Sequence, residues 1–216
     1  MKLTKYTHSC VRLEDHDTVL VLDPGGFSEV EEALEGAQHI LITHVHPDHF
    51  DEEKVLAFLK KNPEVTLHAP DAVVDSIKKA LPNAAATAVT ADGQLELSGF
   101  TIKTFGGQHA IIHPLLPVID NVGYLIDDNL FHPGDSFVVP HGIEVKTLLV
   151  PLHAPWNKIS EVIDFIIAVR AQKAFQIHDS LLAENGRNMI VGHVTNFGKK
   201  YGTEFEYLPA GTSVHI

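Results

Sequence analysis

Three histidines and one aspartate lie within the six consecutive residues from His44 to His49, and no other feature constrains the chain as strongly. Side chains two residues apart on an extended segment project to the same face, so His44 and His46 can share one metal ion. Pro47 imposes a turn before Asp48 and His49, which can then face a second ion. The segment is therefore interpreted as a loop that serves two metal ions rather than as a chance run of surface histidines.

Three further side chains could complete two such sites. His109, Asp135 and His178 each follow a short apolar or β-branched run and lie next to turn residues or a polar break. That is the position of a ligand on a loop at the end of a strand. A lone His or Asp there is usually a structural hydrogen-bonding group. The evidence that these three are metal ligands is therefore their order along the chain.

With these residues in view, the chain resembles the metallo-β-lactamase fold superfamily. The signature of that superfamily is a His-x-His-x-Asp-His loop followed by a distant His, a Gly-Asp dipeptide and a final His. The matching positions occur here in that order: His44, His46, Asp48, His49, His109, Asp135 and His178. On softer features, the segments 132–136 and 154–156, the chain is most similar to small bacterial members of the ascorbate-6-phosphate-lactonase-like branch.

The resemblance implies an αββα four-layer sandwich of the α/β (α+β) class, with residues 1–216 forming one domain. It also implies a ligand set. One ion would be bound by His44, His46 and His109, the other by Asp48, His49 and His178, with Asp135 bridging them. Zinc is the expected cofactor, two ions per chain, although histidine and carboxylate ligands also suit manganese or iron.

Two metal ions held a few ångströms apart convert a shared water to hydroxide near neutral pH. We therefore expect a metallo-hydrolase that cleaves a small-molecule lactone, ester, amide or phosphodiester, with Asp48 and Asp135 as catalytic residues. No Gly-x-Ser-x-Gly elbow or phosphate-binding loop offers a competing mechanism. The alternatives are a mono-iron oxidoreductase of the persulfide dioxygenase type and a non-catalytic binding protein on the same fold.

The hydrophobic pattern alternates between strands and helices. Apolar runs predict strands within residues 1–22 and at 39–43, 65–68, 122–126, 130–131, 147–152 and 174–177. Between 88 and 109 the pattern predicts hairpins, with Asp92-Gly93 as the main turn signal and Ser98-Gly99 as a weaker one. Helices are predicted at 28–36 from the capping-box spacing of Ser28 and Glu31, and at 51–61, 71–81 and 159–167; a further helix and strand close the chain.

The net charge and the cysteine content limit the kinds of binding partner and the cellular location that we expect. A formal net charge of −12 with only three arginines disfavours nucleic-acid binding, which depends on clustered basic residues. The single Cys10, the apolar-poor N-terminus and the lack of a run of about 20 apolar residues indicate a cytoplasmic protein without a membrane partner. The expected partner is a small molecule, with an anionic one compatible with two bound cations, and homo-oligomers are compatible with a chain of this size.

Several residues have two readings. Asp23 either orients the imidazoles of the histidine loop or only forms the turn before Pro24. His8 lies either at the mouth of the site or at the end of an edge strand. His153 and Trp156 either line the pocket or pack a loop onto the core, and the loop at 111–121 is a candidate for substrate specificity. The remaining histidines with no spacing argument, left out of the metal set, are His113, His132, His141 and His193.

Overall fold

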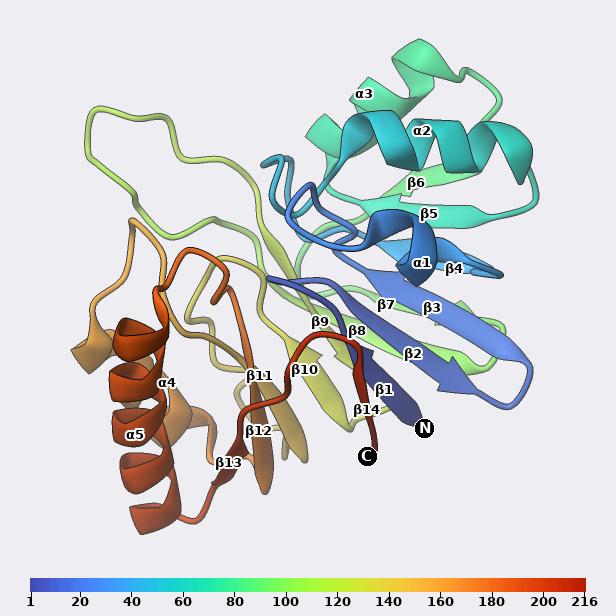
Figure 1. The fold of residues 1–216 in the computed structure, drawn as a ribbon. Coiled ribbons are helices and arrows are strands. Elements are labelled where there is room, and N and C mark those ends of the chain that lie inside the picture. The colour runs from blue at the N-terminus through green and yellow to red at the C-terminus, as the bar shows by residue number, and fades with distance from the viewer.

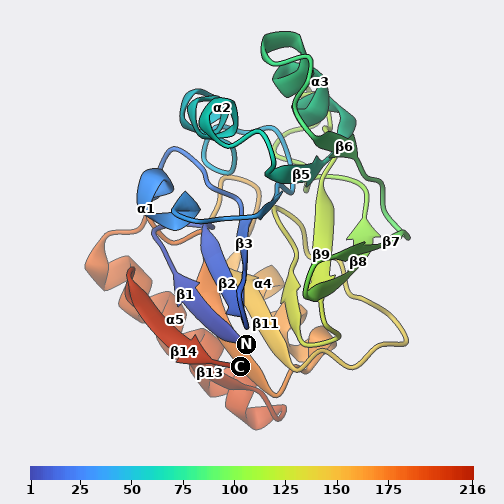
Figure 2. The same ribbon diagram turned by 90° about the vertical axis from the view of Figure 1, so that its right-hand side faces the viewer.

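Two seven-stranded sheets face each other in the computed structural model, which describes all residues from 1 to 216 (Figure 1). Helices cover the outer face of each sheet, three on one side and two on the other (Figures 1 and 2). This arrangement is the predicted αββα sandwich. None of the five helices has both the length and the apolar character that crossing a membrane requires.

The first sheet contains the N-terminal half of the chain and, at its edge, the last strand. Its order is β14 (Thr212–His215), β1 (Lys2–Lys5), β2 (Val11–Asp15), β3 (Thr18–Leu22), β4 (His39–Leu41), β5 (Thr66–Ala69) and β6 (Ala86–Ala88). Strands β3 to β6 are parallel, and parallel neighbours require crossover connections. Those connections hold α1 (Val30–Leu34), α2 (Glu52–Lys61) and α3 (Asp71–Ala80).

The second sheet has the same mixed construction. Its order is β13 (Glu204–Glu206), β12 (Lys173–Ile177), β11 (Thr147–Pro151), β10 (Leu130–His132), β9 (Val122–Ile126), β8 (Phe100–Gly106) and β7 (Gln94–Leu97). Strands β10 to β13 are parallel, and α4 (Ile159–Val169) and α5 (Glu184–Lys200) form crossovers on the outer face. Of the apolar stripe predicted for α4, Val162 and Ile166 are buried, whereas Ile159 is 38% exposed. Phe165, which was not part of that stripe, is buried beside them.

Three separate apolar clusters hold the four layers together. The central cluster lies between the sheets and joins residues such as Leu13, Leu22 and Leu41 of the first sheet to Ile102 and Ile126 of the second. A second cluster packs α1, α2 and α3 onto the first sheet, and a third packs α4 and α5 onto the other. Because both faces of each sheet are buried, the central strands read as continuous apolar runs.

The predicted capping box at Ser28 is wrong. The helix begins at Val30 after Glu29, and no side chain caps it. The Ser28 hydroxyl donates instead to the carbonyl of Gly25 at 2.7 Å, within the turn that follows β3. A serine hydroxyl that satisfies a neighbouring turn is no longer available to the first turn of a helix.

Of the two turn signals predicted between 88 and 109, the weaker one closes a hairpin and the stronger one does not. Ser98-Gly99, the weaker signal, forms the tight connection of the β7–β8 hairpin, with Gly99 at a φ of +83°. Asp92-Gly93 is also a turn, but it connects β6 to β7, which belong to different sheets. A turn signal therefore marked the reversal of the chain correctly without showing which strands pair.

Candidate metal centre

All seven predicted ligands meet where the carboxyl ends of strands from both sheets come together. The loop with His44, His46, Asp48 and His49 follows β4, and His178 directly follows β12. His109 and Asp135 follow β8 and β10 of the second sheet. In open α/β sheets, functional residues gather at this end of the strands because loops there are free to vary while the sheet fixes their origins.

The first group of potential ligands contains three imidazoles and one carboxylate. The ring centroids of His44, His46 and His109 form a nearly regular triangle with sides of 4.8, 4.9 and 4.8 Å. The Oδ2 atom of Asp135 lies 3.3 Å from Nε2 of His109 and 4.0 Å from Nε2 of His44. One ligand atom from each of the four residues lies within 4.8 Å of all the others.

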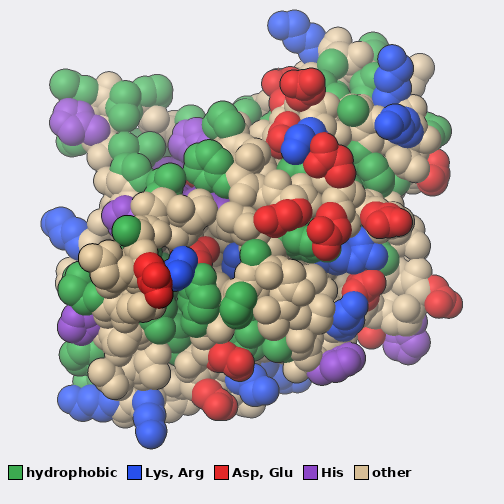
Figure 3. Space-filling model, in the orientation of Figure 1, with side chains coloured by type: hydrophobic (Ala, Val, Ile, Leu, Met, Phe, Trp, Pro, Cys, Tyr) green, Lys and Arg blue, Asp and Glu red, His purple; other side chains and the backbone are tan.

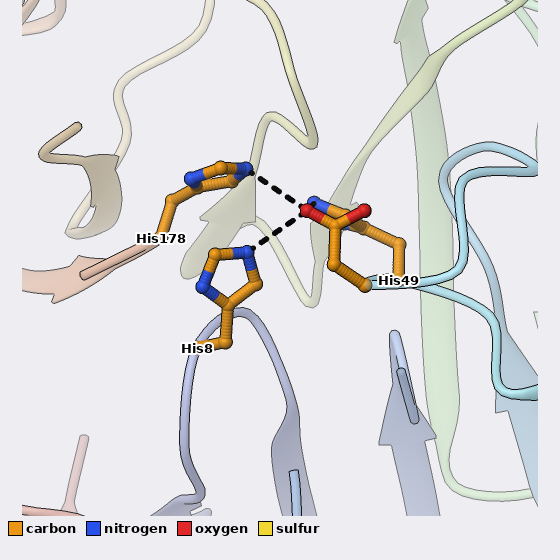
Figure 4. Close-up of side chains that lie close together, drawn as sticks. His8, His49 and His178 are labelled. Atoms are coloured by element: carbon orange, nitrogen blue, oxygen red, sulfur yellow. Dashed lines mark hydrogen bonds and ion pairs between the residues drawn. The ribbon is translucent and has the colours of Figure 1, made fainter. Parts of the chain in front are cut away.

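The second group contains His8, Asp48, His49 and His178, again with ligand atoms within 4.8 Å of one another. The Oδ2 atom of Asp48 lies 3.1 Å from Nε2 of His8 and 3.5 Å from Nε2 of His178. Figure 4 shows the rings of His8, from the turn after β1, and His178, from the end of β12, close to each other. His49 faces them from the loop after β4.

Asp135 contacts both groups. Its Oδ1 atom lies 3.0 Å from Nε2 of His49, and its Oδ2 atom lies 3.2 Å from Nε2 of His178. The same Oδ2 atom contacts His109 of the first group. The carboxylate therefore stands between the two clusters, in the place where a bridging ligand would be required.

Most of these histidines are held from behind through Nδ1. The Nδ1–H of His109 donates to the carbonyl of Ala110 at 2.5 Å, and that of His178 donates to the carbonyl of His153 at 2.6 Å. His49 is held by Asp23, as described below. Fixing Nδ1 in this way leaves Nε2 unprotonated in the neutral ring and aims it at the centre, the usual arrangement behind histidine ligands.

Several buried nitrogens at the centre lack a hydrogen bond of acceptable geometry. They are Nε2 of His44, His109 and His178. Buried polar atoms without partners are rare in native proteins because their desolvation is not compensated. A divalent cation between them would satisfy these nitrogens, and a set of imidazoles and carboxylates without thiolate suits zinc, manganese or iron.

The carboxylates and imidazoles change each other's protonation. Burial lowers the pKa of His44 well below its usual value, and neighbouring imidazoles add to the effect. Burial also opposes the charged forms of His49 and His178, but contacts with carboxylates outweigh it. The pKa of His49 is raised well above its usual value by Asp135 and Asp23, and that of His178 is raised to about 9 by Asp135 and Asp48.

These shifts predict that metal binding releases protons. His178, with a pKa of about 9 in the metal-free protein, is protonated at neutral pH, and a protonated nitrogen cannot bind a metal. An ion that binds to the second group must displace that proton, so its apparent affinity should rise with pH and level off above about 9. Calorimetric titration with zinc, in buffers of different ionisation enthalpy, measures the released protons directly; binding that is independent of pH between 6.5 and 9 would contradict the prediction.

Asp23 supports the histidine loop from below. The carboxylate is fully buried and accepts hydrogen bonds from the backbone N–H of Thr43 at 2.7 Å and from the Thr43 hydroxyl at 2.8 Å. Its Oδ2 atom also accepts from Nδ1 of His49 at 2.7 Å. Of its two readings from sequence, the contacts match the one in which Asp23 orients an imidazole.

His8 is the residue that sequence reasoning placed least well. It lies in the turn between β1 and β2, is fully buried, and contacts Ser180 through Nδ1 at 2.8 Å. It is therefore at the floor of the second group, neither at the mouth nor merely at a strand end. No spacing rule connects a histidine near the N-terminus to a loop at 44–49, because they come together only through the order β1-β2-β3-β4 within the sheet.

Three residues at the centre have backbone conformations that are rare for residues other than glycine. His8, Asp23 and His178 have positive φ angles of 63°, 47° and 57°, in a region that residues other than glycine seldom occupy. Such conformations persist only where the surrounding contacts determine them, and they are common at functional sites.

Trp156 contacts the centre, whereas the histidines excluded from the metal set do not. Its indole N–H donates to Oδ2 of Asp135 at 2.8 Å, so Trp156 lines the pocket as well as packing the loop after β11. His153 contributes its backbone carbonyl to His178. His132 is buried with both nitrogens engaged, donating to the carbonyl of Ser9 and accepting from the N–H of Gly134. The side chains of the other three are exposed: His113, His141 and His193.

Comparison with known proteins agrees with this geometry. A family model described as the beta-lactamase superfamily domain matches residues 2–178 and so includes every predicted ligand. The chain belongs to the beta-lactamase superfamily. The superfamily resemblance seen in the sequence is thereby confirmed.

One relative and one solved structure match nearly the whole chain, and a further relative matches about three fifths of it. Protein Rv0786c of Mycobacterium tuberculosis is 39% identical over 219 residues, 99% of each chain. The UPF0173 metal-dependent hydrolase MJ1163 of Methanocaldococcus jannaschii is 27% identical over 139 residues, 62% of this chain and 60% of its own. Igni18, a metallo hydrolase from Ignicoccus hospitalis, has the same fold, with a TM-score of 0.74 at 17% identity over 99% of this chain and 97% of its own.

Proposed function

We propose that this protein is a metal-dependent hydrolase with a dinuclear centre, acting on a small molecule. The observation that carries the proposal is the position of Asp135, whose carboxylate contacts imidazoles of both ligand groups. The name of the relative MJ1163, a metal-dependent hydrolase, supports the same class of reaction.

The two groups define which residues would hold each ion. His44, His46 and His109 are proposed for one ion, and Asp48, His49 and His178 for the other, with Asp135 shared and His8 as an added ligand of the second. Zinc is the proposed metal, since the set contains imidazoles and carboxylates and the first group offers four donors, the number that zinc sites commonly use. Two such ions, when bound, activate a water molecule for attack and polarise the bond that it attacks.

The remaining residues position the reacting groups. The Trp156 N–H fixes one oxygen of Asp135 at 2.8 Å, which leaves the other oxygen directed at His49. A cavity of about 320 Å³ opens beside these ligands, which is the lower end of the range for small-molecule sites. Its walls include the apolar side chains of Phe27, Ile112 and Leu181.

Removal and return of metal test this function. Activity on a panel of lactones, esters, amides and phosphodiesters should disappear after treatment with a chelator and return with two equivalents of zinc. Thermal unfolding of the metal-free protein serves as the control, because it shows that the chain remains folded when activity is lost. Hydrolysis that survives complete removal of metal would refute the proposal, and one iron per chain with oxidation of a persulfide would indicate a different enzyme class.

Replacing His8 by alanine should weaken the second metal site selectively. His8 contacts Asp48 at 3.1 Å, and loss of a group that holds a metal ligand typically costs roughly 10- to 100-fold in metal affinity. Zinc titration should then show one tight and one weakened equivalent per chain. His113→Ala, on an exposed loop, is the matched control and should leave both equivalents tight; a variant at His8 with two tight equivalents would exclude this residue as a ligand.

A further inference from the structure

The cavity beside the metal centre has apolar walls built from four separate segments. Phe27 comes from the loop after β3, Ile112 from the loop between β8 and β9, Pro155 and Trp156 from the loop after β11, and Leu181 from the loop after β12. The polar residues that line the same cavity are the candidate metal ligands themselves. Apolar surface therefore surrounds the only part of the cavity where chemistry can occur.

These apolar side chains are unusually accessible. Phe27 is 48% exposed, Ile112 is 39% exposed and Leu181 is 53% exposed. Exposed apolar groups scattered singly over a surface need no explanation, but groups that converge on one cavity indicate a ligand that covers them. The covering ligand must then present apolar surface next to the bond that is cleaved.

The cavity contains no group suited to an anion other than the metal centre. Neither Lys nor Arg lines it, and neither lines the adjoining hollow formed by His46, His109 and residues 110–112 and 116–119. Phosphate recognition in proteins relies on such charge-assisted donors. The formal net charge of −12 further disfavours the approach of an anionic molecule or an anionic lipid surface.

The loop between β8 and β9 extends the apolar wall outwards. Ile111, Leu116 and Val118 are exposed on it, and Figure 3 shows hydrophobic side chains on this projecting lobe at the upper left. Leu115 of the same loop lines neither the cavity nor the hollow beside it. Leu116 and Val118 line the hollow that adjoins His46 and His109, so the wall is continuous with the metal centre. A chain of several methylene groups could follow it.

We propose that the site takes a neutral substrate whose acyl, alkyl or aryl group lies against Phe27, Ile112, Trp156 and Leu181. This inference rests on the proposed hydrolase function and names the substrate class of the same site. A small molecule is favoured over a second copy of the chain because the apolar groups line a concave cavity of about 320 Å³ that ends at the metal ligands.

Trp156 allows binding to be measured without catalysis. It is the only tryptophan and lines the cavity, so its fluorescence reports occupancy. We would titrate the zinc-loaded protein with 2-methyl-, 2-butyl- and 2-hexylcyclopentanone, neutral lactone analogues that cannot be hydrolysed. Affinity should rise about fourfold for each methylene group that is buried. Affinity that does not depend on chain length would overturn the inference.

Two variants locate the effect. Ile112→Ser and Leu181→Ser should reduce the gain per methylene, whereas Leu115→Ser, 87% exposed on the same loop and outside the cavity lining, should leave it unchanged. Because the readout is a ratio within one protein sample, partial misfolding of a variant does not imitate it. An equal effect of Leu115→Ser would overturn the inference in favour of a docking face on the projecting loop.

Hydrolysis assays separate this inference from the proposed function. The corresponding alkyl γ-lactones should be cleaved faster as the chain lengthens, and a phosphorylated sugar lactone should be a poor substrate. Preference for the phosphorylated lactone would overturn the inference while leaving the hydrolase function intact. Chain-length-dependent binding without hydrolysis of any lactone, ester, amide or phosphodiester would support the apolar site and refute the hydrolase.

Discussion

Replacing Asp135 by asparagine will lower kcat/KM by more than about a hundredfold, because outer groups behind a metal ligand already cost 10- to 100-fold and Asp135 is proposed as a ligand itself. The carboxylate lies 3.0 Å from His49 and 3.3 Å from His109, so one substitution affects both ligand groups. Asparagine has only one side-chain oxygen, so it can contact one ligand group as an acceptor while its N–H₂ faces the other ligand group. We therefore expect the bound zinc to fall below two equivalents per chain, as measured by elemental analysis after dialysis.

The control for this substitution is Asp120→Asn. Asp120 is exposed at the end of the loop before β9, and its replacement removes the same charge without touching either ligand group. It should bind two zinc ions and retain full activity. If Asp135→Asn also kept two tightly bound ions and most of its activity, the bridging role proposed for this carboxylate would have to be abandoned.

That the candidate ligands lie close together could be predicted in part, because four of them are close in the sequence. His44, His46, Asp48 and His49 lie on one short loop, and local geometry alone places them together. His109, Asp135 and His178 needed the resemblance to a known signature, since nothing local shows which strand ends are neighbours. His8 was not placed because its contact with Asp48 depends on how β1 pairs with β2 and on a positive φ.

The same distinction between local and long-range information decides which parts of the fold could be predicted from the sequence. Apolar runs located β4, β9, β11 and β12 to within a residue or two, and Val162 and Ile166 of the stripe predicted for α4 lie in the core. Pairing was less accessible: the strong turn signal at Asp92-Gly93 joins two sheets, and the weak signal at Ser98-Gly99 closes a hairpin. Which partner a strand selects depends on the apolar cluster between the sheets, which exists only in the folded chain.

Replacing Asp23 by asparagine will reduce both stability and metal affinity. Asp23 is fully buried and its Oδ2 atom accepts from the Thr43 hydroxyl and from Nδ1 of His49. An asparagine side chain keeps the oxygen needed by the Thr43 N–H but presents N–H₂ to the other two donors. Removing one partner of a buried charged pair costs about 3–5 kcal/mol, so the midpoint of urea unfolding should fall markedly in the metal-free protein.

The loss of metal affinity follows from the tautomer of His49. Facing an N–H₂ group, Nδ1 of His49 can be accommodated only as an acceptor, which moves the proton to Nε2, the atom that faces Asp135. A protonated Nε2 cannot bind a metal, so the second ion should bind roughly 10- to 100-fold more weakly in zinc titrations. Asp51→Asn is the matched control, because Asp51 caps α2 through the N–H of Lys54 and asparagine caps a helix about as well as aspartate. Equal zinc affinity in the two variants would show that Asp23 supports the turn but does not set the protonation of His49.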